Sequence, residues 1–129
     1  MSTIKRFEDI HAWQEGRKLA AMIYNATKGG GLAKDFGLKD QLQRAAVSVS
    51  SNIAEGFARS GNKEFLNFLW IARGSATEVQ SQLYTAKDIG YINEQQFDLI
   101  YDQAASASML IYKLIQSIKS SNYKGARYT

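Results

Sequence analysis

The chain has 129 residues, 45% of them hydrophobic and 22% charged, so we expect one folded domain over residues 1–129 and not a disordered chain. The absence of cysteine and the single histidine exclude disulfide bonds, thiolate metal sites and any multi-histidine metal site within one chain. Lysine and arginine number 16 against 12 aspartates and glutamates. The resulting net charge of +4 is compatible with a nucleic-acid partner but does not establish one.

The first two predicted helices cover about residues 9–28 and 38–58. Asp9 is expected to cap the first helix, and Gly29–Gly31 to form the turn that follows it. Apolar and small residues recur at spacings of three and four, the period of a helix that buries one face. In the first segment they are Trp13, Gly16, Ala20, Ile23, Tyr24 and Thr27. In the second they are Leu38, Leu42, Ala45, Ala46, Val49, Ile53 and Phe57.

The third predicted helix covers about residues 62–89. Its apolar residues alternate spacings of four and three, which is the heptad seam of helices that pack at about 20° to a neighbour. They are Phe65, Leu69, Ala72, Ala76, Val79, Leu83 and Ala86. Asn62 is the expected N-cap, and Gly90 is expected to end the helix.

The fourth predicted helix covers about residues 94–120, and a basic tail, residues 121–129, follows it. Asn93 and Gln96 have the spacing of a capping box, which marks the start of this helix. Four amphipathic helices with short links predict an all-α fold, an antiparallel up-down-up-down four-helix bundle.

The sequence predicts neither a targeting segment nor a membrane-spanning segment. Lys5 and Arg6 stand near the N-terminus without a following apolar region, so we expect no signal peptide. No apolar run approaches the ~18–20 residues that a membrane helix needs. We therefore expect a cytoplasmic protein with no membrane partner.

The beginning of the third predicted helix is apolar on almost every side. Leu66, Trp70 and Ile71 lie outside the core seam, and exposed apolar patches with tryptophan often mark protein interfaces. We predict that these residues form an interface with further copies of the chain. The alternative is that the connecting loops or the C-terminal tail cover them.

Polar residues lie on the outer faces of the second and third predicted helices. Asn52, Glu55 and Glu78 are interpreted as a structural network in which the glutamates balance nearby arginines; the alternative is that both faces are simply solvated. Gly56 and Gly74 lie inside helices, where glycine costs about 1 kcal/mol relative to alanine. They therefore suggest close backbone approach.

Basic residues are the candidates for nucleic-acid binding. We predict that Arg44, Arg59 and Arg73 make the main contacts, with Lys39 and Lys63 in support. Phosphate binding needs clustered cations, and a ring of subunits would repeat a modest patch and gain avidity. The alternative is that these arginines hold the fold or the ring together.

Glu8 and His11 have the Glu-x-x-His spacing of di-iron bundles. Such sites need two of these motifs, and His11 is the only histidine. A Ser-His-Asp triad would also have to use His11, with nothing marking an activated serine. We predict no catalytic residue, no metal and no cofactor, and therefore no enzyme.

Four stretches of the sequence carry a family signature: Phe7-Glu8-Asp9-Ile10, Arg44-Ala45-Ala46-Val47-Ser48-Val49, Ser51-Asn52-Ile53-Ala54-Glu55-Gly56 and Ala72-Arg73-Gly74-Ser75. Through them the chain resembles the four helix bundle protein family, also called 23S rRNA intervening-sequence proteins. The resemblance implies a four-helix bundle that assembles as a homopentameric ring without an established catalytic site. A related branch, the accessory variability determinant of diversity-generating retroelements, is a basic pentamer that binds nucleic acid and partners a reverse transcriptase.

The sequence therefore predicts a non-enzymatic, homo-oligomeric bundle, a pentamer, that binds structured RNA or DNA through basic residues repeated around the ring. The alternative is a protein-interaction adaptor, such as an accessory subunit of a reverse transcriptase. Salt dependence separates the two, because phosphate binding weakens steeply with salt and apolar contacts do not.

Overall fold

Helices account for almost all of residues 4–120, the part of the chain that this computed structural model describes. Five α-helices follow one 3₁₀ turn, and no strand occurs in that range, which confirms the all-α class. The bounds are η1 Phe7–Asp9, α1 His11–Ala26, α2 Gly30–Lys34, α3 Phe36–Ala58, α4 Asn62–Ile89 and α5 Glu94–Ser120. The predicted basic tail lies outside the described residues. None of the helices described is long and apolar enough to span a membrane.

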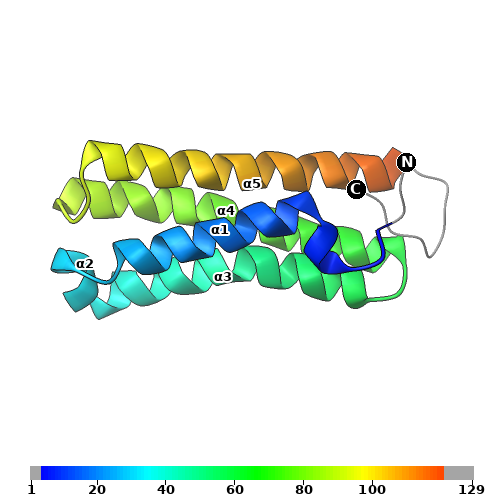
Figure 1. Cartoon of the computed structure of the whole chain (residues 1–129), viewed down its shortest axis with the longest axis horizontal. Helices are drawn as coiled ribbons and strands as arrows, with labels where there is room; N and C mark the ends of the chain where they lie inside the picture. Colours follow the sequence, from blue (N-terminus) through cyan, green and yellow to red (C-terminus); the bar gives the residue numbers. More distant parts are fainter. Residues whose placement is uncertain (1–3, 121–129) are drawn as a thin grey trace.

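The four long helices lie side by side (Figure 1). Both α3 and α5 contact α1 on one side and α4 on the other, so the four helices enclose a common interior. In the view of Figure 1, α1 and α4 run from right to left, and α3 and α5 run from left to right. Helix α4 therefore has two outer flanks, one beside α3 and one beside α5.

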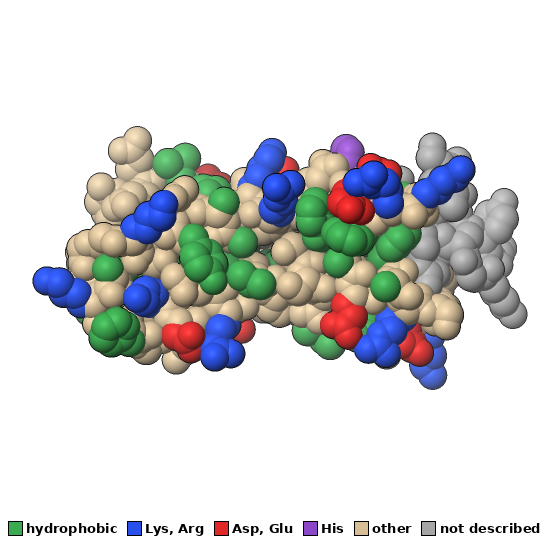
Figure 2. Space-filling model, turned by 60° about the horizontal axis from the view of Figure 1, so that its bottom comes forward, with side chains coloured by type: hydrophobic (Ala, Val, Ile, Leu, Met, Phe, Trp, Pro, Cys, Tyr) green, Lys and Arg blue, Asp and Glu red, His purple; other side chains and the backbone are tan. Residues whose placement is uncertain are grey.

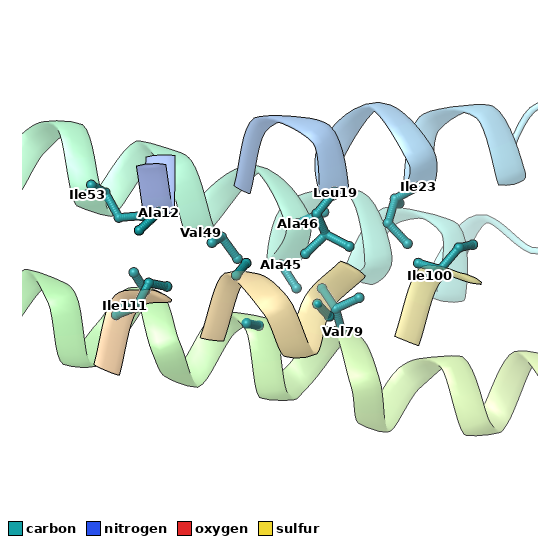
Figure 3. Packing of buried hydrophobic residues seen from close by; sticks show 14 of the residues in the cluster. Ala12, Leu19, Ile23, Ala45, Ala46, Val49, Ile53, Val79, Ile100 and Ile111 are labelled. Carbon is teal, nitrogen blue, oxygen red and sulfur yellow. The ribbon is translucent and has the colours of Figure 1, made fainter. Parts of the chain in front are cut away.

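The core is built from the apolar seams of these helices. Figure 3 shows side chains from all four long helices pointing into it, among them Leu19 of α1, Val49 of α3, Val79 of α4 and Ile111 of α5. The whole predicted seam of α4 is buried. In α5 the buried residues are Phe97, Ile100, Ala104, Ala107, Ile111, Leu114, Ile115 and Ile118, whereas Tyr101 and Ser108, which we also expected on this face, are only half-buried. The heptad periodicity of residues 62–89 therefore identified the buried face of α4 correctly.

The buried face of α1 is rotated from the predicted one. Tyr24 was expected in the core and is exposed, whereas Ala12 and Leu19 are buried. The buried residues Ala12, Gly16, Leu19 and Ile23 have spacings of four, three and four, which is the same heptad seam as in α4. The choice of Tyr24 was wrong because its neighbour Ile23 already fills the position that faces the interior.

The start of α1 also differs from the prediction. Asp9 belongs to the 3₁₀ turn, and α1 begins at His11 with Ile10 in the N-cap position and no side-chain capping bond. Ile10 is almost completely buried. Burial of this apolar side chain fixes the chain where Asp9 would otherwise have capped the helix.

The segment between α1 and α3 is more ordered than a glycine turn. Residues Gly30–Lys34 form α2, and α3 begins at Phe36, two residues before the predicted start. Asp35 caps α3, because its Oδ1 accepts the backbone N–H of Leu38 at 3.1 Å. Its Oδ2 accepts the hydroxyl of Tyr91 at 3.0 Å, and this hydrogen bond raises the pKa of the Tyr91 phenol. Asp35 thus ties this end of α3 to the turn between α4 and α5.

The two ends of the α4–α5 turn agree with the sequence signals. Gly90 adopts a left-handed conformation with φ of 93° and ends α4 as predicted. The capping box is present, since the backbone N–H of Gln96 donates to Asn93 Oδ1 at 2.8 Å and that of Asn93 donates to Gln96 Oε1 at 3.0 Å. At the other end of α4 the prediction was wrong: Gly61 takes the N-cap position, and Asn62 is the first helical residue.

Replacing Asn93 by alanine is expected to lower the free energy of unfolding by about 1 kcal/mol, because α5 loses the acceptor that caps its first turn. Urea unfolding followed by circular dichroism measures the change. Asn67→Ala, at an exposed position inside α4, is the matched control and should leave stability unchanged or raise it by up to about 0.7 kcal/mol, because alanine is the better helix former. Equal losses in the two variants would contradict the capping role.

Candidate nucleic-acid interface

The five predicted nucleic-acid contacts lie in three separate places. Lys39 and Arg44 are in the first half of α3, Arg59 and Lys63 flank the turn between α3 and α4, and Arg73 lies in the middle of α4. Along α3, Lys39 and Arg59 are about 30 Å apart, because each helical residue advances by about 1.5 Å. The fold of a single chain therefore does not gather these residues into one patch.

Two of the three predicted arginines are already paired with carboxylates. Arg44 Nε lies 2.8 Å from Asp40 Oδ2, and Arg59 Nη2 lies 2.9 Å from Glu55 Oε2. Glu64 is a second partner of Arg59, at 3.8 Å, and the hydrogen bond that Arg59 donates to Glu55 raises the pKa of the guanidinium. On the face shown in Figure 2, basic and acidic side chains are interspersed. Local pairing of this kind weakens the attraction that a phosphate backbone would feel.

The predicted polar network joins α3 to α4, although it uses fewer charges than expected. Asn52 Nδ2 donates to the carbonyl and hydroxyl oxygens of Ser48, both at 2.8 Å, and the Ser48 hydroxyl is hydrogen bonded to that of Ser75 at 2.8 Å. Gln82 Nε2 links the two helices a second time, donating to Gln41 at 3.3 Å and to Glu78 at 3.2 Å. Polar side chains on the α3 flank of α4 are therefore joined to one another and to α3 by hydrogen bonds.

The glutamates of that network balance the arginines only in part. Glu55 pairs with Arg59, whereas Glu78 bonds Gln82. Within residues 4–120, neither glutamate forms an ion pair with Arg44 or Arg73. Arg73 is consequently the predicted arginine whose charge is not paired with an acid in the described chain.

Arg73 is held instead by aromatic rings and a hydroxyl group. Its guanidinium carbon lies 4.5 Å from the ring centre of Tyr112 and 5.8 Å from that of Trp70. Arg73 Nε donates to the Ser108 hydroxyl at 3.3 Å. The ammonium of Lys119 lies 5.6 Å from the Trp70 ring centre, within the range of a cation–π contact. We call Trp70, Arg73, Tyr112 and Lys119 the α4–α5 cluster.

Within residues 4–120, no acidic group forms an ion pair with the cations of the α4–α5 cluster. No aspartate or glutamate follows Asp102 in the sequence. The nearest acids along α4 are directed toward α3, because Glu64 contacts Arg59 and Glu78 contacts Gln82, which bonds α3. Lys63 lies on the outer face of α4 two helical turns before Trp70 and adds a third cation. The α5 flank of α4 is thus a basic, aromatic surface.

The three predicted interface residues do not lie on one surface. Leu66 is half-buried and packs against the core, whereas Trp70 is 41% exposed and Ile71 53% exposed. Trp70 meets Tyr112 of α5 edge to face, with ring centres 6.5 Å apart. Ile71 is one turn before Ser75, which contacts α3. Trp70 and Ile71 therefore lie on opposite flanks of α4.

Gly74 lies on the outer face of α4 between these two flanks. A Cβ atom at Gly74 would meet no atom of the described chain within 4 Å apart from its chain neighbours and the adjoining backbone of its own helix. The predicted close approach is therefore absent within the chain at this glycine. At Gly56 the prediction holds, because a Cβ there would lie 2.6 Å from Cβ of Phe68.

Tyr112, Lys119 and Ser108 were not identified from the sequence as site residues. Their partner Arg73 is 35 residues from Ser108 along the chain, so only the pairing of α4 with α5 brings them together. The sequence did contain one signal for this site. No acidic residue follows Asp102, so all charged residues in the second half of α5 are basic.

Within residues 4–120, no group of three or more His, Cys, Asp or Glu side chains is placed to hold a metal ion. His11 is exposed in the first turn of α1. Glu8, the other member of the Glu-x-x-His pair, contacts Arg6 at 3.3 Å on the protein surface.

Similarity to known proteins was found in two comparisons. Residues 8–113 match the family model of the 23S rRNA-intervening sequence protein. A solved protein of unknown function from the S23 ribosomal protein family of Bacteroides thetaiotaomicron is similar in structure, with a TM-score of 0.76. It is 24% identical in sequence, and the alignment covers 81% of this chain and 95% of that one, so this likeness bears on the fold alone. No curated protein matches the sequence.

Proposed function

The chain belongs to the family of 23S rRNA-intervening sequence proteins, and from that premise we propose that it binds RNA or DNA as a non-enzymatic assembly of identical subunits. Each subunit is an antiparallel four-helix bundle, and five of them form a ring. The basic surface beside α5 binds the phosphate backbone, and the opposite flank of α4 contacts a neighbouring copy.

The observation that carries this proposal is the charge of the α4–α5 cluster. Arg73 is fixed by Ser108 and by the Tyr112 ring, while within residues 4–120 its terminal guanidinium nitrogens make no hydrogen bond. A guanidinium held in this way can donate two parallel hydrogen bonds to a phosphate. Lys119 and Lys63 add charge to the same flank, and each phosphate that they neutralise releases counterions.

Repetition makes the modest charge of one subunit useful. A single copy of the α4–α5 cluster offers only a few phosphate contacts, which supports weak binding. Five copies on one ring engage the same nucleic acid together, and the effective concentration of the later contacts raises the overall affinity.

The contact between subunits is proposed on the α3 flank of α4. Ile71 is an exposed apolar residue, and Gly74, one turn away, leaves open space on the outer face. Glycine inside a helix costs about 1 kcal/mol relative to alanine, and close approach of a second chain gives a reason for that cost. The arginines on this flank are paired with acids, so they do not repel a basic neighbour.

Arg73→Gln and Arg44→Gln test the site, because each removes one positive charge from a helix surface. We expect Arg73→Gln to weaken binding of structured RNA or duplex DNA about tenfold and to make its salt dependence less steep. The substitution Arg44→Gln should change the affinity less than about twofold, because Arg44 is already paired with Asp40. Fluorescence anisotropy across a salt series measures both, and light scattering in the same buffers checks assembly.

Equal effects of the two substitutions would overturn the assignment of Arg73. Absence of binding to any nucleic acid at low salt by an intact assembly would overturn nucleic-acid binding itself. The adaptor function, such as that of an accessory subunit of a reverse transcriptase, would then take its place.

A further inference from the structure

Two aromatic rings of the α4–α5 cluster are exposed in the middle of its charges. Trp70 is 41% exposed and Tyr112 39% exposed, although each is large and apolar enough to be buried. Their planes meet at 66°, so the two rings do not stack face to face on one another. A flat partner can therefore stack on the indole without first separating a stacked pair.

The cations around Trp70 fit the backbone of such a partner. Arg73 and Lys119 both lie within 6 Å of the indole centre and belong to different helices. A nucleobase on the indole would bring the phosphates on either side of it close to these two groups. Proteins that bind single strands combine these same elements, an aromatic platform and flanking positive charge.

From this geometry we infer that the α4–α5 cluster binds unpaired nucleotides, with one base stacked on Trp70 and the adjoining phosphates held by Arg73 and Lys119. The inference rests on the proposed function and specifies which form of nucleic acid the same site takes. In a duplex the faces of the bases are covered by their neighbours, so only the phosphate contacts remain available to it.

The strength of the competing contacts supports stacking. A base on an aromatic side chain contributes about 5- to 150-fold in affinity. The exposed cation–π contact between Lys119 and Trp70, which the base would displace, contributes about 2- to 5-fold. The flexible Lys119 side chain regains an electrostatic partner when its ammonium moves to a phosphate.

Tryptophan fluorescence tests the inference directly. The sequence has two tryptophans, Trp13 and Trp70, so the full-length variant Trp13→Phe reports on Trp70 alone. We would titrate this variant with a 12-nucleotide oligothymidylate, with a 12-base-pair duplex, and with heparin, a polyanion that has no bases. We expect strong quenching with the single strand and little with heparin, and single-strand affinity at least about fivefold above duplex affinity.

Trp70→Leu and Trp70→Tyr in the otherwise unchanged chain give the second arm. Leucine keeps an apolar side chain without a stacking surface, and we expect it to weaken single-strand binding about 5- to 50-fold, a larger loss than for the duplex or for heparin. Tyrosine should restore much of the loss. Circular dichroism and light scattering confirm that each variant keeps its helices and its assembly.

Each other outcome counts against the inference. Single-strand binding that leaves Trp70 fluorescence unchanged, or that survives Trp70→Leu, overturns stacking and leaves the proposed function intact. Dissociation of the assembly by Trp70→Leu shows that a neighbouring subunit covers the ring, which overturns the inference as well. Failure of single strand, duplex and structured RNA alike to bind overturns both the inference and the proposed function.

Discussion

Ile71→Glu is expected to break the assembly into single chains that keep their helices. Ile71 is more than half exposed on the outer face of α4, where the proposed subunit contact lies. Burying an unpaired carboxylate in such a contact costs several kcal/mol, and a ring repeats that cost at every interface. In a free chain the same glutamate is solvated, and its helix propensity is at least as good as that of isoleucine.

Size-exclusion chromatography with light scattering measures the dissociation, and circular dichroism measures the helix content. The matched control is Trp70→Glu, which places the same charge on the opposite flank of α4. We expect this control to stay assembled and to lose nucleic-acid binding. An Ile71→Glu chain that remains assembled would move the interface to another face of the bundle.

Gly56→Ala is expected to leave the protein about 1–3 kcal/mol less stable than Gly74→Ala. Both substitutions gain about 1 kcal/mol of helix propensity, so their difference isolates the packing around the new methyl group. At Gly56 that methyl would lie 2.6 Å from Cβ of Phe68 and 3.1 Å from Cδ1 of Phe65. Neither atom can move far, because Cβ of Phe68 is fixed by the backbone of α4 and Phe65 is buried.

The comparison is best made in the Ile71→Glu background, where the free energy of unfolding does not include subunit contacts. Urea unfolding of each glycine variant against that background gives the two values. Gly74→Ala should be neutral or stabilising there, since its methyl group meets no atom of the described chain within 4 Å apart from its chain neighbours and the adjoining backbone of its own helix. Two equally stable variants would contradict the tight α3–α4 contact at Gly56.

Local signals in the sequence located α4 and α5 well. The bounds Asn62–Ile89 and Glu94–Ser120 match the predicted ranges. Each signal that marks them, a heptad seam, a capping box or a terminal glycine, depends on residues only a few positions apart along the chain. The start of α1 was missed, since Ile10 is fixed by burial in a core that distant helices build. The helix α2 was missed because a glycine run alone predicts a turn.

The predicted arginines also differ in whether their partners could be identified from the sequence. The pairs Arg44–Asp40 and Arg59–Glu55 have a spacing of four along one helix, so the sequence could have identified both arginines as neutralised. No spacing along the sequence identifies the partners of Arg73, because the Tyr112 ring and the Ser108 hydroxyl belong to another helix.

The sequence by itself determined that this protein is helical and which face of α3, α4 and α5 is turned to the interior, because the period of a helix is written within each segment. Leu38 and Phe57, at the two ends of the predicted stripe of α3, are only half-buried. Only the tertiary structure decided the character of the surface. It placed Trp70 and Ile71 on different flanks of α4, and it brought Arg73 and Lys119 beside an exposed indole, where neither forms an ion pair with an acid of residues 4–120. That surface depends on which helices become neighbours, and residues many turns apart meet there through packing alone.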